Sequence, residues 1–144
     1  QRRRFEKEIK DAFEFGSFNF AKESLAILDN LQRAKIAIKN DKSLKENKDL
    51  EKFLENISII EKDLISIFEK NRITKIDTKG KKFDPNLHQA MAEVEDNHSE
   101  AGTVVQEIQS GYMFGERLLR PALVGVAKKK NLKNEEKKEK KEQK

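Results

Sequence analysis

The stretch LEKFLENISIIEKDLISIFEK, residues 50 to 70, indicates the fold class of this chain. Its apolar side chains recur every three or four residues, which is the spacing of one face of an α-helix. That face consists of Leu50, Phe53, Leu54, Ile57, Ile60, Leu64, Ile67 and Phe68. Ile59 and Ile65 widen it beyond what a single partner helix can cover. The stretch therefore predicts a helix that packs against more than one neighbour.

A second amphipathic segment precedes this one in the chain. No proline occurs from Arg2 to about Lys39, and apolar residues recur there at helical spacing. Gly16 stands among several phenylalanines, so we expect a kink or a change of packing partner near it. The polar run NDKSLKENKD, residues 40 to 49, predicts a loop between the two helices.

Two apolar helices joined by a short loop predict an antiparallel hairpin. Because the apolar face of the second helix is too wide for one partner, we expect a homodimer in which two hairpins form a four-helix bundle of coiled-coil type. The residues expected in the core of this bundle are Leu25, Leu28, Leu31, Phe53, Ile57, Ile60 and Leu64.

The composition changes after Asn71. Short segments rich in β-branched residues follow, and they are separated by glycines and other turn-forming residues. We expect strands over residues 88 to 95, 103 to 109 and 118 to 127. The sequence thus predicts an α+β fold in three parts, which are a long helix with a helical hairpin for dimerisation over 1–71, a small C-terminal all-β domain over 72–128 and a disordered lysine-rich tail over 129–144.

Composition limits the classes of function. Of the 144 residues, 40% are charged and only 35% are hydrophobic, which favours a solvated helical protein that buries surface against a copy or a partner. The absence of cysteine excludes disulfides and thiolate metal sites. No apolar run reaches the roughly 18 residues of a transmembrane helix, and no signal peptide is visible, so we expect a cytoplasmic protein without membrane contact. Because Gln1 is not a methionine, we expect the natural protein to begin upstream.

The net charge of +5 is carried by the C-terminal tail. Residues 128 to 144 contain nine lysines and four glutamates, so the rest of the chain is formally neutral. Such a low-complexity run is typical of a solubilising extension, and we expect no nucleic-acid partner. One alternative stays open, namely a coiled-coil scaffold or binding module whose basic tail engages nucleic acid or an anionic surface.

The run FDPNLHQAM, residues 83 to 91, places an acid and a histidine close together. No serine or cysteine nucleophile with an oxyanion arrangement accompanies them, two histidines cannot supply a structural zinc site, and the common phosphate-binding loops are absent. We therefore expect no enzyme activity, no metal or other cofactor and no direct nucleotide binding. A structural role is better supported, with Phe83 as an anchor, Asp84 and Pro85 forming a turn, and His88 structural.

Three segments together resemble a known family. FDPNLHQAM is followed, after nineteen residues, by GYMFGERLLRPALVGVAK at 111 to 128, and LAILDNLQRA lies upstream at 25 to 34. This pattern resembles the signature of GrpE, the nucleotide exchange factor of DnaK-type heat-shock chaperones, and it covers residues 1 to 128. The resemblance implies a homodimeric co-chaperone of protein folding and the stress response, which opens the ATPase domain of the chaperone so that ADP leaves.

The resemblance also implies which residues contact the chaperone. They are Arg2, Arg3, Phe15, Arg33, Pro85, Asn86, Arg117 and Val126. Arg117 is the first choice, because a guanidinium offers a bidentate fork to a partner carboxylate. The chain has Asn56 and Arg72 where the family usually has glycine. Since asparagine tolerates unusual backbone conformations and arginine does so poorly, we expect these two positions to affect helix packing and the entrance to the β domain.

Overall fold

The computed structural model describes residues 1–128, and packing divides them into two compact units. Unit 1 comprises Gln1–Lys75 and Tyr112–Arg120, and unit 2 comprises Ile76–Gly111 and the chain from Pro121 onward. Both long helices belong to unit 1, and each unit contains one three-stranded sheet. The predicted α+β fold is therefore confirmed. No helix within residues 1–128 combines the length and apolar content needed to span a bilayer.

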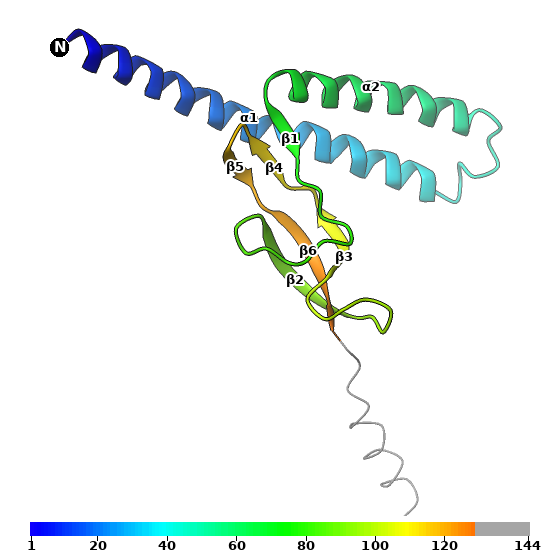
Figure 1. Cartoon of the computed structure of the whole chain (residues 1–144). Helices are drawn as coiled ribbons and strands as arrows, with labels where there is room; N and C mark the ends of the chain where they lie inside the picture. Colours follow the sequence, from blue (N-terminus) through cyan, green and yellow to red (C-terminus); the bar gives the residue numbers. More distant parts are fainter. Residues whose placement is uncertain (129–144) are drawn as a thin grey trace, which may run out of the picture. The chain divides into compact units, whose positions relative to one another are not determined.

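The helix α1 (Arg2–Asn40) is unbroken over 39 residues and runs from blue to cyan in Figure 1. Every residue from Arg2 to Gly16 is exposed. The buried residues Ala21, Leu25 and Leu28 lie in the second half, and their spacing of four and three places them on one face. Packing of α1 within the chain therefore begins after Gly16, the helix continues through this residue, and a partner for its first half stays a prediction.

The helix α2 (Leu50–Lys70) follows a loop fixed by side-chain hydrogen bonds. Asp41 Oδ1 accepts a hydrogen bond from the Ser43 N–H at 2.8 Å, and Asn47 Oδ1 accepts one from the Asp49 N–H at 2.9 Å. Such Asx turns offer the backbone an alternative to continuing the helix. The chain reverses direction here, and Figure 1 shows the second half of α1 beside α2. The predicted helical hairpin is confirmed.

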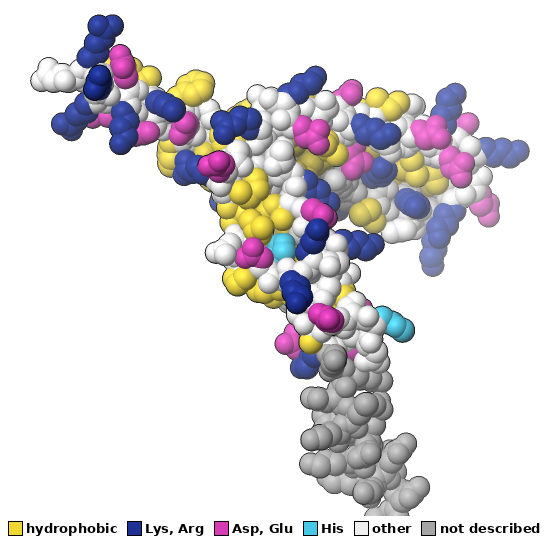
Figure 2. All heavy atoms as spheres, viewed as in Figure 1, with side chains coloured by type: hydrophobic (Ala, Val, Ile, Leu, Met, Phe, Trp, Pro, Cys, Tyr) yellow, Lys and Arg dark blue, Asp and Glu magenta, His cyan; other side chains and the backbone are white. Residues whose placement is uncertain are grey.

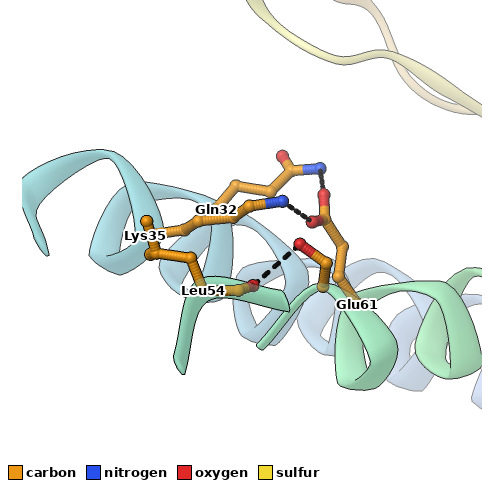
Figure 3. Close-up of polar contacts among 5 residues, drawn as sticks. Gln32, Lys35, Leu54 and Glu61 are labelled. Atoms are coloured by element: carbon orange, nitrogen blue, oxygen red, sulfur yellow. Dashed lines mark hydrogen bonds and ion pairs between the residues drawn. The ribbon is translucent and has the colours of Figure 1, made fainter. Parts of the chain in front are cut away.

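Polar side chains join the two helices (Figure 3). Glu61 of α2 accepts hydrogen bonds from Gln32 Nε2 and Lys35 Nζ of α1, each at 3.0 Å. Burial raises the pKa of Glu61, but the hydrogen bonds from Lys35 and Gln32 and the charge of Lys35 outweigh it, so the pKa lies below the ordinary value. The ionised carboxylate therefore holds α1 and α2 in one alignment.

The sheet of unit 1 has the order β1-β4-β5 and is antiparallel. Its strands are β1 (Ile73–Lys75), β4 (Tyr112–Phe114) and β5 (Arg117–Arg120). The core of unit 1 consists of Ala21, Leu25, Leu28, Phe68, Ile73, Tyr112 and Leu119, with Phe18, Leu64, Ile65 and Phe114 half-buried against it. The sheet therefore packs on the same face of α1 that meets α2.

Arg72 lies between α2 and β1 with a φ of 66°. This left-handed conformation suits glycine and strains a residue with a Cβ. Gly115 approaches it closely, since its N–H donates to the Arg72 carbonyl at 2.8 Å, and a Cβ at Gly115 would lie 2.4 Å from the Arg72 guanidinium. Arg72 thus occupies a backbone position that favours glycine, as its departure from the family pattern suggests.

The sheet of unit 2 has the order β2-β6-β3. Its strands are β2 (His88–Glu95), β3 (Val104–Gln109) and β6 (Ala122–Lys128), with β6 parallel to β2 and antiparallel to β3. The core of unit 2 consists of Val104, Ala122 and Val124, with Phe83 and Val126 packed against it. β6 is the central strand, and all of its residues from Ala122 to Ala127 are buried or half-buried.

The single strand expected over residues 118 to 127 is wrong. Pro121 separates β5 from β6, and the two strands belong to different sheets. Proline has no N–H to donate to a ladder, so it is disfavoured inside a central strand. Gly111 lies against the start of β6, where a Cβ would approach the Ala122 nitrogen to 2.4 Å, so that only glycine fits.

Candidate functional site

Four of the predicted contact residues lie on α1, and all are exposed: Arg2, Arg3, Phe15 and Arg33. Arg2 is 3.6 Å from Glu6 in a solvent-exposed pair, which holds its side chain only weakly. Arg2 and Arg33 are separated by about 46 Å along the helix axis at the usual rise per residue. A partner that contacted both would therefore have to extend along most of α1.

Arg117, the first choice among the contact residues, begins β5 and is exposed. Its guanidinium carbon lies 5.1 Å from the centroid of the Phe18 ring on α1. Phe15 precedes Phe18 by three residues, so the two share a face of the helix. Arg117 thus lies over an aromatic ring on the face of α1 that also carries Phe15, and the sequence did not single out this ring.

Arg120 lies three residues further along β5 and is engaged differently. Its guanidinium donates to both carboxylate oxygens of Asp29 on α1, at 2.6 and 2.7 Å, and lies 5.5 Å from the centroid of the Tyr112 ring. The side chains of Arg120 and Asp29 are only 14% and 15% exposed. This bidentate ion pair attaches β5 to α1. The guanidinium of Arg120 donates to Asp29 within the chain and is not presented to a partner.

The turn before β2 presents Pro85 and Asn86, both exposed. Asp84 Oδ1 accepts the Asn86 N–H at 2.9 Å, and the Asp84 carbonyl accepts the His88 N–H at 2.8 Å. The buried His88 ring closes the turn, because its Nδ1 accepts the Asp84 N–H at 3.0 Å. Phe83 is half-buried against the core of unit 2. The structural roles predicted for Phe83, Asp84, Pro85 and His88 are confirmed.

Val126, the remaining predicted contact residue, is half-buried in β6 opposite Val104 and Glu93. Within residues 1–128, no group of three or more His, Asp or Glu side chains is placed to hold a metal ion. The lysine-rich tail assigned to 129–144 lies outside the described residues.

The residues predicted for the core of the dimeric bundle differ in exposure. Leu25 and Leu28 are buried inside unit 1 itself, Leu31, Ile57 and Leu64 are half-buried, and Phe53 and Ile60 are 52% and 58% exposed. An apolar groove on unit 1 is lined by Ile27, Leu31, Ile60, Asp63, Leu64 and Ile67. Hydrophobic side chains also reach the surface among charged ones along the helices (Figure 2). Their participation in a dimer stays a prediction.

Sequence reasoning missed Asp29, Arg120 and Phe18 as a group. Asp29 and Arg120 are 91 residues apart in the chain, so no local spacing could pair them. The only signal was the crowd of phenylalanines around Gly16, and it did not say which ring would meet β5.

Comparison with known proteins relates the arrangement to a family. The family model described as GrpE matches residues 1–128. Proteins named "Protein GrpE" from Rhodopseudomonas palustris (strain HaA2) and Afipia carboxidovorans are 50% and 48% identical over 127 residues, which is 88% of this chain. The chain spans 62% and 64% of the length of these two relatives, which is less than two thirds. A relative of the same name from Rhizorhabdus wittichii is 48% identical, and 69% of its length is covered.

The match includes the helical hairpin, the Asp84 turn and both sheets. The paired helices, the turn that exposes Pro85 and Asn86, and the strand that carries Arg117 all lie within the matched residues. Because the family model matches all the described residues, and these relatives are about half identical to the chain over 127 aligned residues, this protein belongs to the GrpE family.

Proposed function

We propose that the chain is an adenine-nucleotide exchange factor, a co-chaperone that binds the ATPase domain of a DnaK-type heat-shock chaperone and promotes ADP release. The observation that carries the proposal is membership of the GrpE family over residues 1–128. The proposed setting is the cytoplasm, in protein folding and the response to heat stress.

The mechanism needs no reactive group on this chain. A protein that binds the open form of a nucleotide cleft better than the closed form weakens nucleotide binding by the same factor. Each tenfold change requires about 1.4 kcal/mol of differential contact, which a few well-placed anchors can supply. The exposed residues Phe15 and Arg117 of unit 1 and Pro85 and Asn86 of unit 2 are the proposed anchors.

The working form that we propose is a homodimer. On α1, the exposed side chains of Phe5, Ile9, Phe13, Phe20 and Ile27 follow a helical stripe that begins in the half without buried residues. On α2, Phe53, Ile60 and Ile67 are more than half exposed and are seven residues apart. Spacings of four and seven are those of helices that pair along a continuous seam. A second copy would cover these faces and complete a four-helix bundle.

The alternative, a coiled-coil scaffold that acts through its basic tail, rests on residues 129 to 144 alone. Those residues lie outside the described part of the chain. The family match covers the helices and both sheets and favours the exchange factor.

Linkage between the two ligands of the chaperone tests the proposal. The affinity of this protein for a full-length DnaK-type chaperone would be measured by calorimetry, once with the chaperone free of nucleotide and once saturated with ADP. We expect tighter binding to the nucleotide-free chaperone and, reciprocally, weaker ADP binding to the complex by the same factor. Equal affinity in both states would contradict an exchange function.

A further inference from the structure

The two arginines of β5 have opposite surroundings. Arg120 is tied to the Asp29 carboxylate by two hydrogen bonds. Within residues 1–128, no carboxylate pairs with Arg117, and its guanidinium carbon lies over the Phe18 ring, 5.1 Å from the centroid. That distance lies within the roughly 6 Å over which a cation is attracted by an aromatic face. One arginine of the strand is thus used for internal structure, while the donors of the other remain available.

The Phe18 ring is itself held in place. It is half-buried against the core of unit 1, and the Phe114 ring of β4 meets it edge to face, with centroids 6.4 Å apart and planes at 80°. Phe114 is also the register partner of Arg117 across the β4–β5 turn. The backbone of Arg117 therefore pairs with Phe114, its guanidinium lies over Phe18, and these two rings contact each other.

An aromatic support suits a binding arginine better than a carboxylate would. A free arginine side chain loses considerable rotamer entropy when a partner fixes it. A carboxylate within the chain would restrict the side chain, but it would also occupy the N–H fork that a partner needs. An aromatic ring restricts the guanidinium by attracting its positive charge. It leaves the N–H groups available to donate to a partner.

We propose that Phe18 is a positioning residue for Arg117, and that it pre-orients the guanidinium for a carboxylate on the chaperone. The inference rests on the proposed exchange function and adds to it a residue that does its work without touching the partner. Replacing the ring by an aliphatic side chain of similar size would leave Arg117 charged and exposed but free to move. The variant would then bind the chaperone roughly two- to fivefold more weakly.

The first test uses the protein alone. Arg117 side-chain protons above an aromatic face shift upfield in NMR spectra through the ring current. We expect this shift in the wild-type chain and in Phe18→Tyr, which keeps a ring, and its loss in Phe18→Leu. Identical Arg117 shifts in wild type and Phe18→Leu would overturn the positioning role, whatever the chaperone assay gives.

The second test is a double-mutant cycle in ADP release from the chaperone. Phe18→Leu should raise the half-saturating concentration roughly two- to fivefold with an unchanged maximal rate, Phe18→Tyr should restore it, and Phe18→Leu should add nothing in an Arg117→Ala background. A merely structural role for Phe18 predicts the same loss with and without Arg117, and that result would overturn the inference. If wild type accelerates release and Phe18→Leu equals it, only the inference fails. If wild type does not accelerate release at all, the proposed function fails and the inference with it.

Discussion

The two units differ in how many of their large apolar side chains are exposed. Within residues 1–128, eleven large hydrophobic side chains of unit 1 are more than half exposed, and in unit 2 only Met91 and Ile108 are. Unit 2 has a small core around Val124. The turn before β2 is held by hydrogen bonds between its own residues. Unit 1 has the larger core and still leaves apolar stripes on both helices. A monomeric soluble protein seldom exposes large contiguous apolar surface, so this contrast supports the proposal that a second copy covers unit 1.

The largest expected effect comes from the ion pair that fastens β5 to α1. Asp29→Ala would leave the Arg120 guanidinium buried without its carboxylate, and we expect a loss of about 3–5 kcal/mol in the free energy of unfolding of unit 1. The measurement is urea denaturation followed by helix circular dichroism. The matched control in unit 2 is Glu93→Ala, which removes an ion pair with Lys128 whose side chains are 70% and 55% exposed. We expect a much smaller loss there, because solvent screens the exposed pair. Equal losses for both variants would contradict the structural weight given to the Asp29–Arg120 pair.

A charge in the exposed apolar groove tests whether unit 1 is half of an assembly. Ile60→Asp should raise the dissociation constant of the dimer about a hundredfold, equivalent to about 2.8 kcal/mol, because the carboxylate would be buried against the second copy. Sedimentation velocity over a concentration series measures it. Met91→Asp in unit 2 is the control, since Met91 is 56% exposed and Ile60 is 58% exposed. A monomeric wild-type chain, or equal effects of the two substitutions, would remove the contrast between the units.

The strained junction of unit 1 offers a stabilising change. Arg72→Gly should raise the free energy of unfolding by about 1 kcal/mol, because glycine adopts the φ of 66° without a Cβ penalty. The reciprocal control is Gly80→Arg in unit 2, where φ is 74° and no atom lies within 4 Å of an added Cβ, so that backbone strain alone should lower stability by a similar amount. Thermal unfolding measures both. A loss of stability in Arg72→Gly would mean that the contact of the Arg72 guanidinium with Gly115 outweighs the strain.

The smallest expected effect is a pH dependence confined to the helix pair. The pKa of Glu61 is lowered in the folded chain, so the carboxylate stabilises unit 1 fully above its unfolded-state pKa, and this stabilisation is lost as the pH falls through the folded-state pKa. Glu61→Gln should therefore be less stable than wild type at neutral pH and should approach it on acidification below the ordinary pKa of a glutamate side chain. Helix unfolding midpoints across that range measure the difference. A difference that does not change with pH would show that the ionised form of Glu61 is not the source of the stabilisation.

The helices and the longer strands could be predicted from local sequence patterns. Residues 50 to 70 have a helical period over several turns, and the polar loop before them contains Asp41 and Asn47, whose side chains cap turns. The three-residue strands β1 and β4 are too short to show any period. They exist because each pairs with a segment distant in the sequence. For the same reason the run that contains Pro121 was taken as one strand, since nothing local says that its two halves join different sheets.

The candidate site also has a part that local sequence patterns predict and a part that depends on contacts between distant segments. The turn around Asp84 was predictable, because its hydrogen bonds join residues within four positions of each other. The contact residues came from resemblance to a family, and their roles stay proposals. The fork of Arg120 with Asp29 and the ring of Phe18 beneath Arg117 depend on how β5 packs on α1, and no spacing within the chain encodes that packing.

Stopped-flow fluorescence tests most directly the proposed function, which is acceleration of ADP release from a DnaK-type chaperone. The chaperone would be loaded with a fluorescent ADP analogue and mixed with excess ATP and increasing concentrations of the full chain, or of Arg117→Ala as a contact-deficient comparison. We expect a release rate that rises with concentration to a plateau, and a higher half-saturating concentration for Arg117→Ala with an unchanged sedimentation profile. A release rate that stays at its intrinsic value at micromolar concentrations of the wild-type chain would contradict the proposed exchange function.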